Sequence, residues 1–254
     1  EYMALKQSVS WWCFERDDID VNALMTTVDA IGYDAVELVP PEKFQLVTDY
    51  GLQIVTHGLH RPLEQGVAHT KYWHDIQAQA DKNLSLAVKW GIPNLIVFSG
   101  NREGLDAQRG AENAIKQLEV LVKDAESAGV TLILELLNSK VDHPDYMCDN
   151  TAWGIEVVSA INSPNLRLLY DIYHMQVMEG DIIQTIHDHH QWFGHYHTAG
   201  VPGRNEIDAS QELNYSAICK AIVDTGYQGY LGQEFIPLND WKQSLQQAYN
   251  ICND

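Results

Sequence analysis

Three acidic residues and one histidine follow apolar stretches in the C-terminal half of the chain: Glu135, Asp171, His197 and Glu234. Each is separated from the next by about the length of one strand and one helix. Three carboxylates brought to one place would repel one another unless a divalent cation lay between them. Three oxygen ligands and one imidazole suit manganese, magnesium, cobalt or zinc. The four residues therefore predict a site for one divalent metal ion.

The clearest of these positions is Asp171. The residues before it, Leu166 to Tyr170, are mostly apolar and have the length of a buried strand. A carboxylate there is costly to bury unless a partner compensates its charge. We expect the strand to open into a loop at Asp171.

Four further side chains could serve the same site. His174 follows Asp171 by three residues and could reach a bound ligand; the alternative is a buried structural histidine. Arg204 could hold a hydroxyl or carboxylate group of a substrate; the alternative is an ion pair with a nearby acid, Glu206 or Asp208. Glu37 and His57 end two earlier apolar stretches. Each could hydrogen-bond the substrate or orient a metal ligand, or be merely structural.

The elements that must position these residues alternate along the whole chain. The predicted strands are residues 5–12, 35–39, 52–56, 94–98, 130–134, 166–171, 192–197 and 230–234. The predicted helices are residues 20–31, 42–50, 72–90, 106–128, 150–161, 181–189, 214–225 and 240–251. Eight strand–helix units with no linker predict an α/β fold, a (β/α)8 TIM barrel forming a single domain over residues 1–254. In such a barrel the ends of the four late strands meet at one rim.

The composition of the chain argues against certain classes of binding partner. The chain has 254 residues and a formal charge of −19, which repels nucleic acid and anionic membranes. It has neither an apolar stretch long enough to span a membrane nor a visible signal peptide, so we expect a cytoplasmic protein. The chain begins at Glu1 and not at methionine, so removal of an export leader before this residue is an open alternative. None of its four cysteines forms a C-x-x-C pair, which predicts buried thiols rather than a zinc or redox motif.

Several motifs resemble the hydroxypyruvate isomerase family, within the xylose-isomerase-like sugar isomerase and epimerase TIM barrels. The resemblance covers residues 5 to 237, and the motifs are IPNLIVFSGNREG, ELLNSKVDHPDYMCDNTAWG, LLYDIYHMQVMEGD, GHYHTAGVPGR and GQEFIP. It implies metal ligands at Glu135, Asp171, His197 and Glu234. It also implies proton transfer by Glu135 and Glu234, substrate binding by His174 and Arg204, and a homo-oligomer.

Two departures concern the substrate. Hydroxypyruvate isomerases tend to have glutamine at the position of His197 and a basic residue near Ile236, whereas histidine at the ligand position is similar to the ketose 3-epimerases. The resemblance thus implies a metal-dependent isomerase that acts on an α-hydroxycarbonyl compound through an enediolate, such as hydroxypyruvate converted to tartronate semialdehyde. A ketose 3-epimerase or another sugar isomerase is the alternative. A metal-dependent hydrolase and a non-catalytic sugar binder are further alternatives.

Overall fold

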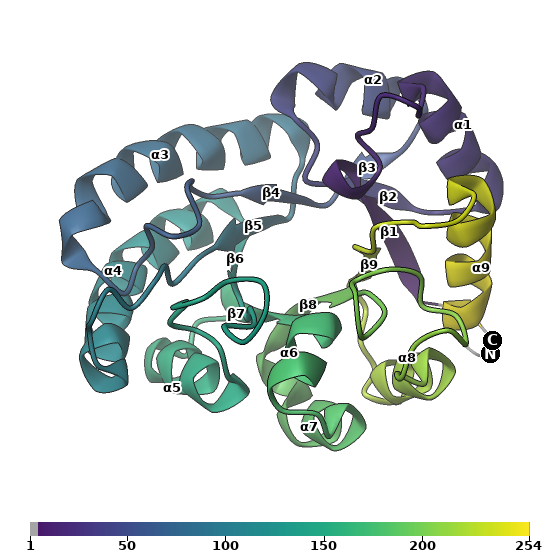
Figure 1. Ribbon diagram of the computed structural model, residues 1–254. Coiled ribbons are helices and arrows are strands. Elements are labelled where there is room, and N and C mark those ends of the chain that lie inside the picture. Colours follow the sequence, from purple (N-terminus) through teal and green to yellow (C-terminus); the bar gives the residue numbers. More distant parts are fainter. Residues whose placement is uncertain (1–4, 254) are drawn as a thin grey trace. The chain divides into compact units, whose positions relative to one another are not determined.

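The structure is a computed structural model that describes residues 5–253. Strands and helices alternate along it, with four short 3-10 helices between them (Figure 1). The strands are β1 (Lys6–Ser10), β2 (Ala35–Glu37), β3 (Gln53–Ile54), β4 (Thr56–Gly58), β5 (Asn94–Val97), β6 (Thr131–Glu135), β7 (Leu166–Asp171), β8 (Phe193–Thr198) and β9 (Tyr230–Gln233). The helices are α1 (Val21–Ile31), α2 (Phe44–Asp49), α3 (Trp73–Trp90), α4 (Ala107–Ala128), α5 (Thr151–Ile161), α6 (Ile172–Met178), α7 (Ile182–His189), α8 (Tyr215–Asp224) and α9 (Trp241–Asn253).

The described residues form two compact units. Unit 1 comprises residues 5–55, 181–190 and 196–253, and unit 2 comprises residues 56–180 and 191–195. In unit 1 the strand order is β3-β2-β1-β9-β8, and in unit 2 it is β7-β6-β5-β4. The pairs β1–β2, β1–β9, β2–β3 and β8–β9 in unit 1 are parallel, as are β4–β5, β5–β6 and β6–β7 in unit 2. Within each unit, therefore, the carboxyl ends of these strands lie at the same edge of the sheet.

Side-chain caps determine where several helices begin. Asp20, Asp106, Asn150 and Asn214 each accept a hydrogen bond from the backbone N–H three residues later, at 2.8 to 3.2 Å. These bonds satisfy N–H groups that have no partner inside the helix. The predicted boundaries of these helices are correct to within one residue at both ends because the cap residues are visible in the sequence.

Three sequence predictions about local structure are wrong. The third strand, expected over residues 52–56, is divided into β3 and β4 around Val55. The chain after Asp171 is not a loop, because α6 begins directly at Ile172. The strand expected over residues 35–39 ends at Glu37, since Leu38 adopts a left-handed backbone with φ of 54°.

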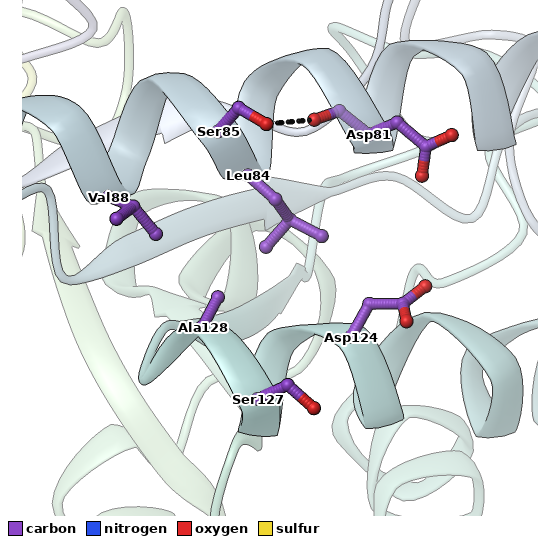
Figure 2. A pocket seen from close by; sticks show the side chains of 7 residues that line it. All are labelled: Asp81, Leu84, Ser85, Val88, Asp124, Ser127 and Ala128. Carbon is purple, nitrogen blue, oxygen red and sulfur yellow. Dashed lines mark hydrogen bonds between the residues drawn. The ribbon is translucent and has the colours of Figure 1, made fainter.

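The surface carries a pocket of about 570 Å³ between α3 and α4 in unit 2 (Figure 2). Its lining comes from two helices: Asp81, Leu84, Ser85, Val88, Asp124, Ser127 and Ala128. None of these residues belongs to the predicted site. In the described part of the chain, no helix combines the length and the apolar composition that crossing a membrane would need.

Candidate metal centre

The four predicted ligands all lie at or near the carboxyl ends of strands. Glu135 and Asp171 are the last residues of β6 and β7, His197 is the fifth of the six residues of β8, and Glu234 directly follows β9. Their exposed fractions are 5%, 1%, 0% and 3%, respectively. Carboxylates at such depth need compensating charge or hydrogen bonds. Glu135 and Asp171 belong to unit 2, and His197 and Glu234 belong to unit 1.

In unit 2, the strand register directs Glu135 and Asp171 to the same face of the sheet. Glu135 on β6 is aligned with Leu169 on β7. Side chains alternate along a strand, so Asp171 leaves β7 on the same side as Leu169. The two carboxylates thus end neighbouring strands on one face, which favours a cation between them.

Asp171 also caps α6. Its Oδ1 accepts a hydrogen bond of 2.9 Å from the backbone N–H of His174, while its Oδ2 lies 4.0 Å from Nε2 of His174. The cap explains why a helix, and not a loop, follows the strand, and it fixes the direction of the carboxylate. It also brings His174, which is fully buried, beside the acid.

The hydrogen bonds of His174 define its tautomer. Its Nδ1 accepts from the backbone N–H of Asn138 at 3.1 Å, and the Asn138 side-chain amide lies 2.7 Å from the same nitrogen. A backbone N–H can only donate, so Nδ1 carries the lone pair. Neutral His174 therefore has its proton on Nε2, the nitrogen nearest Asp171.

Tyr146 supports the backbone at Glu135. Its hydroxyl donates to the carbonyl oxygen of Glu135 at 2.9 Å and accepts from the N–H of Ser99 at 3.1 Å. Burial raises the pKa of Tyr146 well above its usual value, so the phenol remains a neutral donor.

In unit 1, Glu234 meets four polar groups. Its Oε2 lies 3.2 Å from Nδ1 of His197 and accepts from Trp12 Nε1 at 3.3 Å and from Ser10 Oγ at 3.4 Å. Its Oε1 pairs with the Arg204 guanidinium at 2.7 Å. These contacts offer donors and a positive charge to the buried carboxylate and hold it in one orientation.

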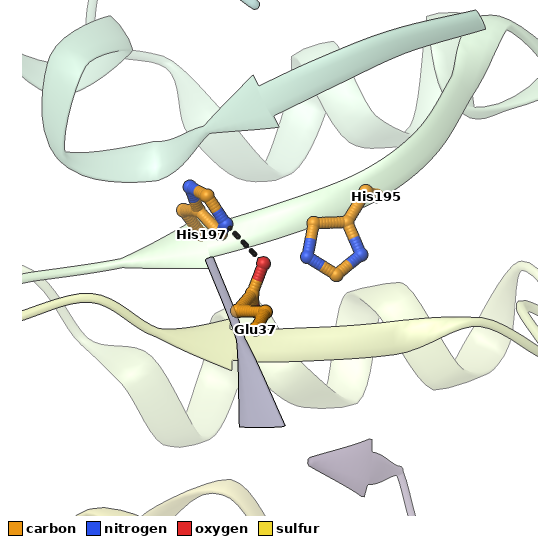
Figure 3. A group of neighbouring side chains, drawn as sticks. All are labelled: Glu37, His195 and His197. Atoms are coloured by element: carbon orange, nitrogen blue, oxygen red, sulfur yellow. Dashed lines mark hydrogen bonds and ion pairs between the residues drawn. The ribbon is translucent and has the colours of Figure 1, made fainter. Parts of the chain in front are cut away.

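His197 lies between two buried carboxylates. Its Nε2 is 2.8 Å from Oε2 of Glu37 (Figure 3). Its other ring nitrogen, Nδ1, lies 3.2 Å from Oε2 of Glu234. A neutral imidazole has one N–H only, so one of the two nitrogens presents a lone pair to a carboxylate. That arrangement is unfavourable unless the ring takes a second proton or a cation lies between the lone pair and the carboxylate. An ionised Glu234 and the Nδ1 of His197 therefore fit a divalent metal ion.

Arg204 has a different partner from the ones proposed on sequence. It pairs with Glu234, and its guanidinium lies 5.1 Å from the centroid of the Trp12 ring. Glu206 instead accepts from the N–H of Leu238 at 2.8 Å. Arg204 has a positive φ of 62°, uncommon for a residue with a side chain, which is consistent with a position fixed by its surroundings.

Two predicted substrate-binding residues differ in setting. Glu37, the last residue of β2, has no exposed surface and contacts His197, which favours the interpretation that it orients a ligand. His57 lies in the middle of β4, aligned with Leu95, and is half-buried. A substrate contact by His57 stays a prediction.

Sequence reasoning missed several participants. Ser8 contacts Glu37, and Tyr146 and Asn138 hold the unit 2 residues. Small polar and aromatic residues of this kind occur throughout the chain, so their types alone give no signal. For His195 the sequence did hold a signal, because His195 precedes His197 by two residues on β8. Both imidazoles therefore leave the strand on the same side, as Figure 3 shows.

Comparison with known proteins identifies the family. A family model described as "Xylose isomerase-like TIM barrel" matches residues 25–251. The chain is 34% identical over 171 residues to the Xenopus laevis protein named "Putative hydroxypyruvate isomerase", covering 64% of this chain and 62% of that protein. It is 29% identical over 172 residues to a 2-oxo-tetronate isomerase of Pectobacterium atrosepticum, covering 67% and 65%. The chain thus spans less than two thirds of the length of these relatives.

A solved structure has the same fold. The crystal structure of an AP endonuclease, family 2, from Brucella melitensis superposes with a TM-score of 0.85 at 23% identity, over 96% of this chain and 97% of that one. The predicted α/β barrel and the predicted resemblance are confirmed at the level of the family. The chain belongs to the xylose isomerase-like TIM barrel family.

Proposed function

We propose that this protein is a metal-dependent isomerase that moves a proton between neighbouring carbons of an α-hydroxycarbonyl substrate. Glu135, Asp171, His197 and Glu234 would hold one divalent cation, since the carboxyl ends of TIM-barrel strands open at one face of the barrel. The observation that carries the proposal is the buried His197 imidazole, which has a carboxylate oxygen of Glu37 or Glu234 beside each ring nitrogen.

When bound, a divalent cation would polarise the carbonyl and hydroxyl oxygens of the substrate and stabilise the negative charge of an enediolate. The chain's own residues would move the proton. One of the two glutamates, Glu135 or Glu234, would remove the carbon-bound proton as a general base. The same glutamate or the opposite one would return it.

Other side chains would orient the reactants. The Arg204 guanidinium holds Oε1 of Glu234 at 2.7 Å, which leaves Oε2 facing His197. The Nε2–H of His174 could donate to a substrate oxygen, because Nδ1 is occupied by Asn138. Substrate binding by Arg204 and by His174 stays part of the proposal.

The substrate we favour is hydroxypyruvate, converted to tartronate semialdehyde, or a related 2-oxo acid. The names of the Xenopus laevis and Pectobacterium atrosepticum relatives support this choice. A ketose 3-epimerase is the second candidate, and the histidine at position 197 favours it. Both reactions begin with the same proton removal, and they differ in the carbon or the face that receives the proton.

Deuterium exchange from solvent tests the proposal. The protein, loaded with Mn²⁺ in D2O, would be incubated with hydroxypyruvate and with several ketoses, and each sugar or acid examined by NMR. Deuterium at the carbon next to the carbonyl of hydroxypyruvate, with formation of tartronate semialdehyde, supports the isomerase. Exchange at C3 of a ketose with inversion supports the epimerase. No exchange into any member of the panel would favour a binding protein.

A further inference from the structure

We infer that Glu37 is a positioning residue that fixes the ring and the tautomer of His197, so that Nδ1 is presented to the metal ion. The inference rests on the proposed function, because it assigns a role toward that metal. The three residues concerned, Ser8, Glu37 and His197, are linked by hydrogen bonds, and we call them the Glu37 relay. All three side chains belong to unit 1 and have no exposed surface.

Both oxygens of Glu37 are committed within the relay. Oε1 accepts from the Ser8 hydroxyl at 2.7 Å, and Oε2 lies 2.8 Å from Nε2 of His197. An ionised carboxylate can only accept hydrogen bonds, so Nε2 of His197 must carry a proton. The lone pair of the neutral ring is then on Nδ1, which lies 3.2 Å from Glu234. The relay thus selects one nitrogen as the metal ligand.

A glycine makes room for this arrangement. Gly232 on β9 is aligned with Ser8 on β1 and with His197 on β8. A Cβ atom at position 232 would lie 1.9 Å from Oε1 of Glu37 and 2.8 Å from Cδ2 of His197. The φ angle of Gly232 is not among the positive ones, so the backbone there does not require glycine. The missing side chain is needed because Glu37 reaches His197 through that space.

The chemistry of the relay is that of a carboxylate behind a metal-bound histidine. Such a carboxylate fixes the imidazole orientation and raises its basicity, and its loss typically weakens metal binding by about 10- to 100-fold. A residue that bound substrate directly would instead leave metal affinity unchanged. Metal affinity therefore separates the two roles that the sequence left open for Glu37.

The test measures Mn²⁺ binding by electron paramagnetic resonance or calorimetry in wild-type protein and in three variants. Glu37→Gln keeps the size of the side chain but removes its charge, and Gly232→Ala fills the space that Glu37 crosses. For both we expect about 10- to 100-fold weaker binding. Glu206→Gln is the matched control. Glu206 is another buried glutamate of unit 1, it accepts from Leu238 and Ser244, and wild-type affinity is expected for its variant.

A measurement without substitution keeps the inference testable if the variants misfold. Long-range ¹H–¹⁵N NMR of the metal-free wild-type protein reports the histidine tautomer, and the relay requires a proton on Nε2 of His197. A proton on Nδ1 alone would overturn it, as would Glu37→Gln binding Mn²⁺ like the wild type. Failure of the wild-type protein to bind Mn²⁺ at all would instead contradict the proposed function.

Discussion

The two oxygens of the Glu234 carboxylate face different partners, the Arg204 guanidinium and the His197 imidazole. Arg204 pairs with Oε1, whereas Oε2 faces His197, Trp12 and Ser10. A carboxylate held at both oxygens is a restrained base. Glu135 ends β6 on the face of the sheet to which Asp171 also points. Because the Arg204 pair lowers the basicity of Glu234, we propose that Glu135 first removes the carbon-bound proton.

Replacing Glu135 by glutamine tests this assignment. The amide keeps the size and one oxygen but cannot accept a proton, so turnover should fall by about 10²- to 10⁴-fold. Substrate affinity should change little, since the shape of the site is kept. Turnover and substrate binding would be measured at saturating Mn²⁺, with metal content determined for each sample. Glu119→Gln, on the exposed face of α4, is the control, and full activity of the Glu135 variant would refute the role.

The buried His60 should make stability depend on pH. Burial and the neighbouring Arg61 lower its pKa from 6.5 to about 4, and its Nε2 accepts from the N–H of Phe98 at 3.1 Å. Between these two values the unfolded chain binds a proton that the folded chain does not. The stabilisation from His60 is therefore complete above about pH 6.5 and is lost as the pH falls toward 4, by about 3 kcal/mol in total.

Urea unfolding at several pH values between 7 and 4 would show this loss. His60→Gln should reduce the dependence of the unfolding free energy on pH. His187 is an exposed residue of α7, so His187→Gln should leave that dependence as in the wild type. An unchanged slope in the His60 variant would mean that other groups account for the acid sensitivity.

Among the elements, the junction of β7 with α6 has two tasks that one substitution can separate. Asp171 caps α6 and is also a proposed ligand. Asparagine caps as well as aspartate, so metal-free Asp171→Asn should be at least as stable as the wild type, whereas Asp171→Ala should lose about 1 kcal/mol. Both variants should bind Mn²⁺ poorly. Denaturant unfolding in EDTA and metal titration would check the two halves of this prediction.

The same junction shows what the sequence could and could not predict. The strand was predicted correctly because Leu166 to Tyr170 are mostly apolar and have the length of a strand, and the acid was placed at its end. The helix α6 was missed because a helix of seven residues, directly after a strand, gives little periodicity to recognise. Aspartate followed by helix-compatible residues was the available signal, since aspartate is a strong N-cap.

The candidate site was predictable where chemistry restricts the residue type. Acids and a histidine at strand ends are unusual enough to be noticed, whereas Ser8 and Gly232 are not. The roles of Ser8 and Gly232 depend on the register between strands. That register aligns Ser8 on β1 with Gly232 on β9 and leaves Glu37 within reach of His197. Register between strands far apart in the chain is set by tertiary packing, and no local pattern reveals it.

For the whole molecule, the proposed metal should be a stabilising ligand. A cation that binds only the folded state at 100 times its dissociation constant adds about 2.7 kcal/mol. For a chain of this size that corresponds to a rise in melting temperature of roughly 5 to 10 °C. Thermal unfolding with Mn²⁺, and again after EDTA, would measure the shift. Asp171→Asn should show no shift, and a shift of equal size in that variant would place the ion elsewhere.

Charge distinguishes the isomerase from a nucleic-acid hydrolase of the same fold. The formal charge of −19 should prevent retention of a duplex oligonucleotide even at low salt, where phosphate contacts are strongest. Elemental analysis should give one bound ion per chain. Duplex binding at 50 mM salt together with two or three ions per chain would revive the hydrolase, despite the charge.

The four cysteines have a practical consequence. All are free and buried, and burial raises the pKa of Cys13 and Cys148 well above the usual value. A hydrogen bond with Cys252, together with burial, raises the pKa of Cys219 in the same direction. Maleimide reagents attack exposed thiolates, so the native chain should stay unlabelled while folded. A cysteine introduced for the exposed Val88 on α3 would be the one reactive handle, and a fluorophore or spin label could be attached there without first removing any natural thiol.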